Sequence, residues 1–257
     1  MFGSIAGQVA LVTGAGSPDG IGFAIARALA ALGSTVVIVA TSDRIHVRAA
    51  EIGGAASGHI ADLTNEAAVE RLIGEVVERH GPVSIVVNNA GMASTAAGTD
   101  AAKALEAHTL AEWNDTIARN LSTAFLVCRA TVPAMRAAGY GRIINVASTS
   151  GPVSAFPDGS AYAAAKSGMV GMTRALAIET AASGITVNAV APGWIRTSSA
   201  SEAEHRAGAA SPIGRSGTPH EIAAAVAFLA TPSASYITGT MLVIDGGNAV
   251  AEDHSNG

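Results

Sequence analysis

The chain has 257 residues, of which 49% are hydrophobic and 14% are charged, and its formal net charge is −5. The sequence carries no basic block, which argues against nucleic acid and anionic membranes as partners. No apolar run reaches the length of a membrane span, and the N-terminus lacks the basic-then-apolar order of a secretion signal. We therefore expect a cytoplasmic protein, and its single cysteine, Cys128, permits no internal disulfide.

Short apolar runs alternate with helix-like stretches along the whole chain. In chain order, strands are expected at residues 9–12, 35–40, 58–61, 83–87, 142–146, 185–190 and 241–244. Helices are expected at residues 21–32, 43–52, 65–80, 110–137, 160–182 and 219–230, whereas 93–109 and 197–217 receive no helix or strand. Strands that are apolar throughout are buried on both faces, which predicts an α/β fold with a mainly parallel, seven-stranded sheet. No composition break marks a linker, so residues 1–257 are expected to form a single domain.

The first predicted strand runs into a glycine-rich turn, TGAGSPDGIG over residues 13–22, that opens the first helix. Glycines at a strand-to-helix turn let the backbone bend sharply and approach a ligand closely. The free N–H groups and the dipole of a helix N-terminus favour an anion such as a pyrophosphate. An ordinary glycine-rich turn is the alternative, because the strict G-x-G-x-x-G pattern is broken where Asp19 stands in place of the third glycine.

Tyr162 and Lys166 stand four residues apart, with only alanines between them. In a helix this spacing places both side chains on one face, about one turn apart. A nearby ammonium favours the phenolate, so the pair predicts a tyrosine whose pKa is lowered. Taken alone, the pair is explained as well by a surface lysine one turn after a packing tyrosine.

Further motifs accompany the glycine-rich turn and the tyrosine–lysine pair in a fixed order. The motifs are Thr13-Gly14, Gly20-Ile21-Gly22, Asn88-Asn89-Ala90-Gly91, Ser148, Tyr162 with Lys166, and Pro192-Gly193. Over nearly the whole chain they resemble the short-chain dehydrogenase/reductase family, and most closely its 3-oxoacyl-carrier-protein reductases and related carbonyl reductases. The resemblance implies a Rossmann-like, doubly wound sheet flanked by helices. It also implies an oxidoreductase (EC 1.1.1.-) that transfers a hydride between NADP(H) and a carbonyl or secondary alcohol, with ketone or 3-oxoacyl reduction favoured.

Two stretches depart from the pattern of this family. Five residues separate Gly14 from Gly20, more than the family usually has, as if Pro18 and Asp19 had been inserted. Residues 92–112 also form a longer segment than usual, near the family's active-site mouth or a subunit edge. We therefore expect the inserted turn to bulge and the long segment to influence substrate choice.

The resemblance also implies catalytic roles. Tyr162 would be the general acid in reduction and the base in oxidation, while Lys166 would lower its pKa and hold the nicotinamide ribose. Ser148 would hydrogen-bond the substrate oxygen and polarise it. Asn120 matches the family asparagine that holds a water linking the lysine to solvent, although a structural hydrogen bond also explains a polar residue inside an apolar helix.

A set of cofactor contacts follows from the same resemblance. Asp62 would contact the adenine amino group, unless it caps the helix that follows it. The backbone of Ile195 and the hydroxyl of Thr197 would hold the nicotinamide amide. The expected cofactor-binding residues are Gly14, Gly16, Ser17, Gly20, Ile21, Thr41, Ser42, Arg44, Asp62, Leu63, Asn89, Ala90, Gly91, Tyr162, Lys166, Pro192, Gly193, Ile195 and Thr197.

The end of the second strand bears on which nicotinamide cofactor is used. NAD preference usually needs an acid at this position, where it binds the 2′-hydroxyl of the ribose. Thr41 occupies the position here, and Ser42 and Arg44 come soon after it. Hydroxyls and a guanidinium would not repel a 2′-phosphate, so NADP(H) is favoured. NAD(H) is the alternative, because a slip of one residue would bring Asp43 to the ribose.

Assembly and substrate are also expected from the resemblance. It implies a homotetramer with residues 110–137 and 160–182 at the interface, a substrate lid around 197–217, and a small carbonyl or alcohol as substrate. No metal is expected, since the seven histidines form no His-Glu-x-x-His or similar spacing. Two alternatives stay open: an NAD-dependent secondary alcohol dehydrogenase, and a non-catalytic nucleotide-binding regulator on the same fold.

Overall fold

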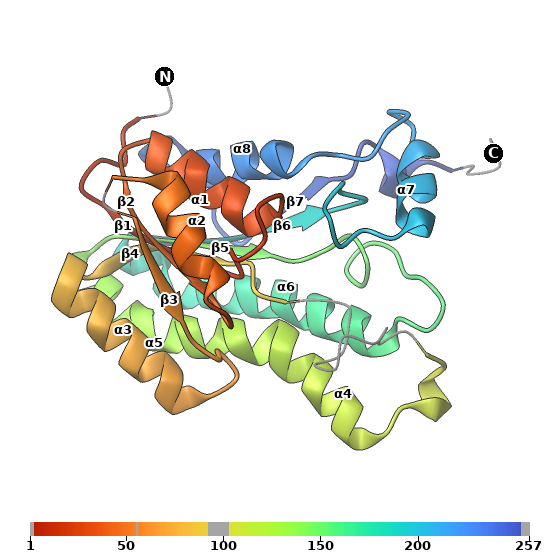
Figure 1. The fold of residues 1–257 in the computed structure, drawn as a ribbon, viewed down its shortest axis with the longest axis horizontal. Helices are drawn as coiled ribbons and strands as arrows, with labels where there is room; N and C mark the ends of the chain where they lie inside the picture. Colours follow the sequence, from red (N-terminus) through yellow and green to blue (C-terminus); the bar gives the residue numbers. More distant parts are fainter. Residues whose placement is uncertain (1–2, 55, 92–102, 253–257) are drawn as a thin grey trace.

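One parallel sheet organises the molecule (Figure 1). The computed structural model describes residues 3–54, 56–91 and 103–252. The strand order is β3-β2-β1-β4-β5-β6-β7, and every neighbouring pair is parallel. The strands are β1 (Val9–Thr13), β2 (Thr35–Ala40), β3 (Ser57–Ile60), β4 (Val83–Asn88), β5 (Gly141–Val146), β6 (Ile185–Pro192) and β7 (Met241–Ile244). The predicted seven-stranded, doubly wound parallel sheet is therefore confirmed.

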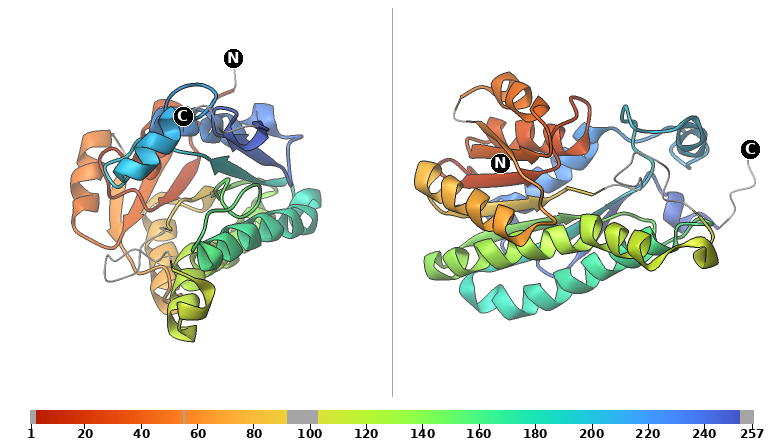
Figure 2. Two further views of the ribbon diagram at one scale, coloured as in Figure 1. Left: turned by 90° about the vertical axis from the view of Figure 1, so that its right-hand side faces the viewer. Right: turned by 60° about the horizontal axis from the view of Figure 1, so that its bottom comes forward.

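Helices cover both faces of this sheet, as the two views of Figure 2 show. One apolar cluster joins the sheet to α1, α2 and α8, and another joins it to α3, α5 and α6. The longer helices are α1 (Ile21–Ala31), α2 (Arg44–Ile52), α3 (Glu66–His80), α4 (Leu110–Ile117), α5 (Thr123–Ala138), α6 (Ser160–Thr180), α7 (Glu202–Ala209) and α8 (Pro219–Ala230).

Successive residues of each strand face opposite helical layers. In β1, Val12 belongs to the cluster that contains α1 and α8, whereas Leu11 belongs to the cluster that contains α3 and α5. In β2, Ile38 and Val37 divide in the same way, and all four side chains are fully buried. This follows from the two-residue period of side chains along a strand. Because helices occupy both faces, a ligand can reach the sheet only at the ends of its strands.

The strand order reverses between β1 and β4. From β1 the chain moves outward through β2 to β3 at one edge, and then returns to β4 on the other side of β1. At such a switch point the loops that follow the two central strands diverge and leave a crevice. The glycine-rich turn at 13–22 and the segment at 88–91 therefore border one crevice.

Two helical regions differ from the sequence-based expectation. The helix expected over 110–137 is divided into α4 and α5 by a π-helical turn, Ala118–Ser122. Helix α7 lies in the 197–217 segment, to which no helix was assigned. Residues 92–102 of the unusually long segment lie outside the described part of the chain. Cys128 is buried in α5, and burial raises the pKa of its thiol to about 11, which suits a packing role.

The described residues contain neither a membrane-spanning helix nor a cluster of metal ligands. None of the helices in that part of the chain is both long and apolar enough to span a membrane. The same residues contain no group of three or more His, Cys, Asp or Glu side chains arranged to hold a metal ion.

Candidate active site

The predicted catalytic residues lie near the carboxyl edge of the sheet. Gly14 follows β1, Gly91 follows β4 and Ser148 follows β5, and the carboxyl ends of parallel strands share one edge. Helix α6 reaches the same edge, because Lys166 donates a hydrogen bond of 3.0 Å to the carbonyl of Val146, the last residue of β5. Loops that are far apart in the sequence therefore meet at this place.

A network of hydrogen bonds joins the glycine-rich turn to the end of β4. The Thr13 hydroxyl accepts from the backbone N–H groups of Asn89 and Ala90 at 3.0 and 2.9 Å. It also donates to the Val87 carbonyl at 3.3 Å. The Asn89 amide donates to the carbonyls of Thr13 and Gly14, both at 3.0 Å. Thr13 was not among the predicted contacts, yet it holds together several residues that were, and the Thr-Gly pair was the signal for it.

Close approach of backbone segments explains the glycines of this turn. Gly14 has a φ of +69°, and a Cβ at this position would lie 2.8 Å from the Cα of Ala90. A Cβ on Gly22 would lie 2.5 Å from the side-chain amide nitrogen of Asn89. A Cβ on Gly16 would lie 3.1 Å from the last side chain of β2. Side chains at the first two positions would clash directly, so the turn needs glycine there.

The start of α1 has the properties of an anion site. Gly20 is the N-cap residue, and no side chain caps the helix, which begins at Ile21. Helix N-terminal N–H groups without such a cap are available to a ligand, and the helix dipole favours negative charge there. The two inserted residues form a turn closed by a 3.3 Å hydrogen bond from the Gly20 N–H to the Ser17 carbonyl. The uncapped terminus fits the pyrophosphate of a dinucleotide.

The end of β2 presents a guanidinium and hydroxyls. Thr41 is exposed, Ser42 is half-buried, and the Nε of Arg44 donates to the Ser42 hydroxyl at 3.2 Å. Asp43 is the N-cap residue of α2, although its side chain makes no capping hydrogen bond. The basic and the acidic candidates for the ribose contact are thus adjacent in the structure.

The predicted adenine contacts follow β3. The Asp62 carboxylate accepts from the N–H and the hydroxyl of Thr64, at 2.9 and 2.7 Å. Asn65 caps α3 by accepting from the Ala68 N–H at 3.0 Å, so the alternative that Asp62 caps this helix is wrong. Leu63 places its side chain in the core, where it is 6% exposed, and leaves only its backbone for a ligand.

The catalytic candidates on α6 face the end of β5. Tyr162 is half-buried, and Ser148 lies close enough to lower the pKa of its phenol. The Ser148 hydroxyl also accepts from the N–H of Ser150 at 3.1 Å, which orients it. Lys166 is 4% exposed, and its Nζ lies 5.6 Å from the centroid of the Tyr162 ring. The one-face prediction for Tyr162 and Lys166 is therefore consistent with the structure, and Ser148 joins them.

The electrostatics of this pair differ from the expectation. Burial raises the pKa of Tyr162, the nearby Ser148 side chain opposes this increase, and the negative charge of Glu204 on α7 adds to it. Burial lowers the pKa of Lys166 to about 8. The expected lowering of the tyrosine pKa by the lysine is thus wrong, since burial raises the Tyr162 pKa and the Lys166 Nζ donates to the Val146 carbonyl.

Asn120 and Gly91 complete a tight cluster with this lysine. Asn120 lies in the π-helical turn, is 1% exposed, and donates to the Thr116 carbonyl at 3.1 Å. A Cβ on Gly91 would lie 2.6 Å from the Asn120 Oδ1 and 3.3 Å from the Lys166 Nζ. The backbone at Gly91 therefore lies directly beside both side chains. π-helical turns of this kind occur frequently at functional sites.

The Lys166 pKa predicts a pH dependence of stability. In the unfolded chain this lysine has its ordinary pKa of 10.5, whereas in the folded protein it loses its proton near pH 8. Between these values the unfolded chain binds more protons, so this group's contribution to the free energy of unfolding rises with pH and is lost as the pH falls through about 8. We expect wild type to gain stability over Lys166→Met between about pH 8 and pH 10 in urea unfolding, with Lys103→Met as control. The same pH dependence in wild type and Lys166→Met would contradict the shift.

The loop after β6 holds the remaining predicted contacts. Pro192 ends β6, and the Gly193 N–H donates to the Ile244 carbonyl of β7 at 3.0 Å. Ile195 packs against the core cluster of α1 and α8, which leaves its backbone available. The Thr197 hydroxyl lies 3.0 Å from that of a neighbouring serine. These residues pass from the sheet into the 197–217 segment.

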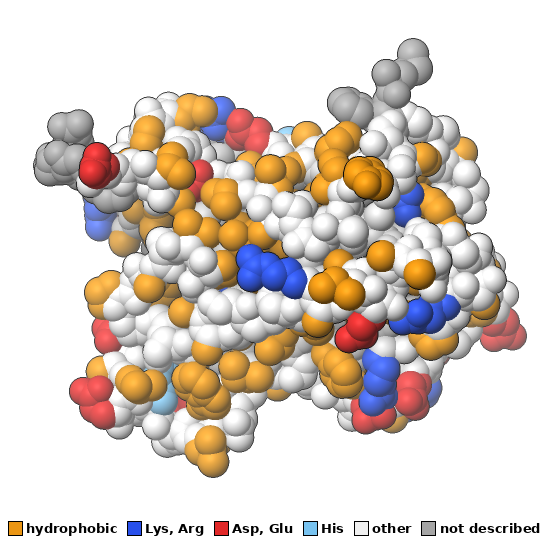
Figure 3. Space-filling view, turned by 180° about the vertical axis from the view of Figure 1, so that it is seen from behind, with side chains coloured by type: hydrophobic (Ala, Val, Ile, Leu, Met, Phe, Trp, Pro, Cys, Tyr) orange, Lys and Arg blue, Asp and Glu red, His pale blue; other side chains and the backbone are white. Residues whose placement is uncertain are grey.

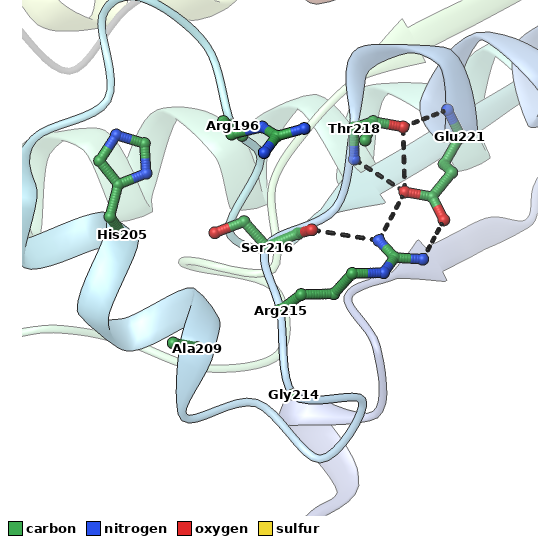
Figure 4. A pocket seen from close by; sticks show the side chains of 8 residues that line it. All are labelled: Arg196, His205, Ala209, Gly214, Arg215, Ser216, Thr218 and Glu221. Atoms are coloured by element: carbon green, nitrogen blue, oxygen red, sulfur yellow. Dashed lines mark hydrogen bonds and ion pairs between the residues drawn. The ribbon is translucent and has the colours of Figure 1, made fainter.

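Two cavities flank the 197–217 segment. The first, of about 640 Å³, lies between α7 and the start of α8, with Arg196 and His205 on its wall (Figure 4). In its lining, Arg215 binds both carboxylate oxygens of Glu221 at 2.7 and 3.0 Å, and Glu221 also caps α8 through Thr218. The second, of about 520 Å³, lies between the same segment and the N-terminus of α1. The predicted catalytic residues line neither cavity, so both belong to the segment and its surroundings.

Comparison with known proteins gave consistent matches over nearly the full length. A family model described as enoyl-(acyl carrier protein) reductase matches residues 14–249. The 3-oxoacyl-acyl-carrier-protein reductase FabG of Escherichia coli strain K12 is 41% identical over 246 residues, which are 94% of this chain and 97% of that protein. The galactitol 2-dehydrogenase (L-tagatose-forming) of Cereibacter sphaeroides is 41% identical over 253 residues, which are 95% and 96%.

A solved structure extends the similarity to three dimensions. It is described as a short-chain dehydrogenase/reductase from Burkholderia xenovorans, and it superposes with a TM-score of 0.87 at 37% identity. The match covers 98% of this chain and 100% of that one. The two enzymes matched at 41% identity are named for different substrates, so overall similarity does not decide the substrate here.

Proposed function

The chain belongs to the short-chain dehydrogenase/reductase family, and from this membership we propose that it transfers a hydride between NADP(H) and a carbonyl or secondary alcohol. The favoured direction is reduction of a ketone or 3-oxoacyl group, in class EC 1.1.1.-. The observation that carries the proposal is the cluster of Ser148, Tyr162, Lys166 and Asn120 at the carboxyl edge of the sheet.

A nicotinamide dinucleotide fits the residues at this edge. The uncapped N-terminus of α1 and the turn from Gly14 to Gly20 would hold the pyrophosphate. Asp62 would lie toward the adenine, and Thr197 toward the nicotinamide. When bound, the cofactor supplies or accepts the hydride, while the protein provides orientation and the proton.

The protein side chains supply acid–base chemistry and polarisation. Ser148 and Tyr162 would both hydrogen-bond the substrate oxygen, since the two side chains lie close together at the carboxyl edge of the sheet. The raised pKa of Tyr162 keeps its phenol protonated near neutral pH, which is the form that donates a proton during reduction. Lys166 would hold the ribose, and Asn120 would hold the water through which the lysine exchanges protons with solvent.

A cofactor assay tests the proposal, and Arg44 offers a sharp variant. We expect NADPH to be oxidised faster than NADH in the presence of a β-keto ester. Because Arg44 would neutralise the 2′-phosphate, Arg44→Glu should lower kcat/KM for NADPH roughly tenfold or more and change that for NADH by about threefold or less. Arg71→Glu, an exposed charge reversal on α3, is the control. A wild-type preference for NADH would contradict the assignment and move Asp43 to the ribose.

A second candidate is NAD-linked oxidation of a secondary alcohol. The similarity to a galactitol 2-dehydrogenase favours it, because that enzyme matches as closely as the 3-oxoacyl reductase does. The same assay distinguishes the two, if NAD⁺ with a polyol is included beside NADPH with the keto ester. Rapid formation of NADH from the polyol alone would favour this candidate.

We further propose a cytoplasmic homotetramer that acts on a small molecule, with residues 197–217 as a substrate lid. Exposed apolar side chains support assembly through the long helices, since Ile178 on α6 is 82% exposed and Phe125 on α5 is 48% exposed. Figure 3 shows the face behind that of Figure 1, where hydrophobic side chains are widely spread between charged ones. Contact between subunits would bury such groups.

A further inference from the structure

The inserted residues of the glycine-rich turn contact a distant part of the chain. The Asp19 carboxylate accepts from the Ser17 hydroxyl at 2.8 Å and from the Ser198 hydroxyl at 2.7 Å. Ser17 and Ser198 are 3.4 Å apart through their own hydroxyls. Asp19 and Ser198 are 179 positions apart in the sequence, so this contact joins the turn before α1 to the start of the 197–217 segment.

Ser198 is held in a defined place, because the segment is also anchored at its base. Arg196 donates its N–H to the Gly217 carbonyl and Gly217 donates to the Trp194 carbonyl, each at 2.9 Å. These two bonds bring together the points where the segment leaves and rejoins the fold. A third bond, from the Ala200 N–H to the Thr197 carbonyl at 3.1 Å, forms a turn around Ser198.

The base bonds hold the ends of the segment, and a 3.2 Å bond from the Ile213 N–H to the Gly246 carbonyl holds its C-terminal half. The Asp19 contact fixes its start to the turn before α1. Pro18, Asp19 and Gly20 form one wall of the 520 Å³ cavity, and residues 196–198 form another. Both hydroxyl bonds to the Asp19 carboxylate, at 2.7 and 2.8 Å, lie within the ordinary range for O–H···O hydrogen bonds. The contact is therefore suited to keep the segment against the N-terminus of α1.

We propose that Asp19 is a positioning residue, which acts through Ser198 to hold the start of the 197–217 segment against the glycine-rich turn at residues 13–22. This inference rests on the proposed function, because it assigns the pyrophosphate to that turn and the nicotinamide amide to Thr197. With Ser198 held, the adjacent Thr197 stays at one distance from the N-terminus of α1. Losing the contact should then weaken cofactor binding more than it slows the chemical step.

Four variants separate the contact from the charge. Asp19→Ala and Ser198→Ala each remove one partner, and the double variant removes both. Asp19→Asn removes the charge but keeps an oxygen that accepts from a hydroxyl. Glu78→Ala, an exposed acid on α3, is the charge-matched control.

The first measurement is hydrogen–deuterium exchange of residues 197–209 in protein without cofactor. We expect faster exchange in Asp19→Ala and Ser198→Ala, and wild-type exchange in Asp19→Asn and Glu78→Ala. This measurement needs no activity, so it tests the contact even if the proposed reaction is wrong. Unchanged exchange in Ser198→Ala, or equal effects of Asp19→Asn and Asp19→Ala, would overturn the proposal.

The second measurement is cofactor affinity beside kcat. We expect the KM and Kd for NADPH to rise roughly three- to tenfold in each alanine variant, with kcat changed by about twofold or less. Because both variants break the contact between Asp19 and Ser198, the double variant should be no worse than Asp19→Ala, which also loses the Ser17 bond. In Asp19→Asn we expect an affinity for NADPH close to that of wild type, because the variant keeps the oxygen that accepts from Ser198. Effects that multiply in the double variant would show that Asp19 and Ser198 act independently. Tighter cofactor binding in Asp19→Ala would show that its charge repels the pyrophosphate. Either result would contradict the proposal.

Discussion

Replacing Tyr162 with phenylalanine is expected to lower kcat roughly 10³-fold, because the change removes the proposed general acid and little else. The ring keeps its place beside Lys166, whose Nζ lies 5.6 Å from the ring centroid. Lys166 also keeps its 3.0 Å bond to the Val146 carbonyl. Cofactor binding, followed by the fluorescence of the reduced nicotinamide, should therefore stay within about threefold of wild type.

A matched variant controls for the loss of a hydroxyl. Tyr236 is fully exposed, so Tyr236→Phe deletes the same atom from a ring in solvent and should leave kcat and cofactor binding unchanged. Near-normal turnover in Tyr162→Phe would mean that the proton comes from another donor. Loss of cofactor binding in that variant would instead show that the phenol holds the cofactor site together.

The sheet was readable from the sequence because its strands are buried on both faces. Continuous apolar runs stand out against helices that expose one side, and five of the strands contain a run that is fully buried in the structure. The alternation of strands and helices predicted the parallel sheet, whereas its doubly wound arrangement was expected from the family resemblance. The weak third strand shifted by one residue, since Ser57 and His59 give it no apolar pattern.

Helix α7 was missed because its stability comes from capping more than from an apolar stripe. The Ser201 hydroxyl accepts a hydrogen bond from the Glu204 N–H at 3.3 Å, and the Glu204 carboxylate accepts one from the Ser201 N–H at 2.7 Å. The S-x-x-E spacing of this capping box is visible in the sequence and was the available signal. Only Gly208 is buried along this helix, so hydrophobic periodicity had nothing to detect.

The parts of the site that depend on tertiary contacts could not be predicted. The spacing of Tyr162 and Lys166 gave their common face, but the direction of the ammonium depends on a carbonyl at the end of β5. The insertion at Asp19 was visible, but its partner Ser198 was not, because no local pattern links positions so far apart. The π-helical turn at Asn120 was also hidden, since it sits within an otherwise regular helical pattern.

Replacing Gly91 with alanine is expected to disrupt the cluster that Gly91 forms with Asn120 and Lys166. The new Cβ would lie 2.6 Å from the Asn120 Oδ1 and 3.3 Å from the Lys166 Nζ, at a φ of +152° that residues other than glycine rarely adopt. Asn120 is 1% exposed and Lys166 is 4% exposed, so neither can move aside into solvent. We expect a loss of stability of about 1–3 kcal/mol, measured by urea unfolding, and a fall in kcat/KM of roughly 10²-fold.

A glycine in open space provides the control. Gly74 lies on α3, with no atom within 4 Å of the position where a Cβ would be. Gly74→Ala should keep full activity and raise stability by about 0.5–1 kcal/mol, as alanine does in a helix interior. Equal effects of the two substitutions would contradict a specific role for Gly91.

A double variant separates the packing of this cluster from its chemistry. Asn120→Ala removes the atom that the Cβ of Gly91→Ala would strike, so combining the two should recover part of the lost stability, while the backbone strain at Gly91 stays. Activity should remain low in the double variant, because the amide proposed to connect Lys166 with solvent is gone. Recovery of both properties would make Asn120 a spacer, and the proton route from Lys166 would then have to avoid it. Recovery of stability alone would place Gly91 at the junction of the backbone and the proton-transfer residues, where only a residue without a side chain leaves Asn120 and Lys166 in place.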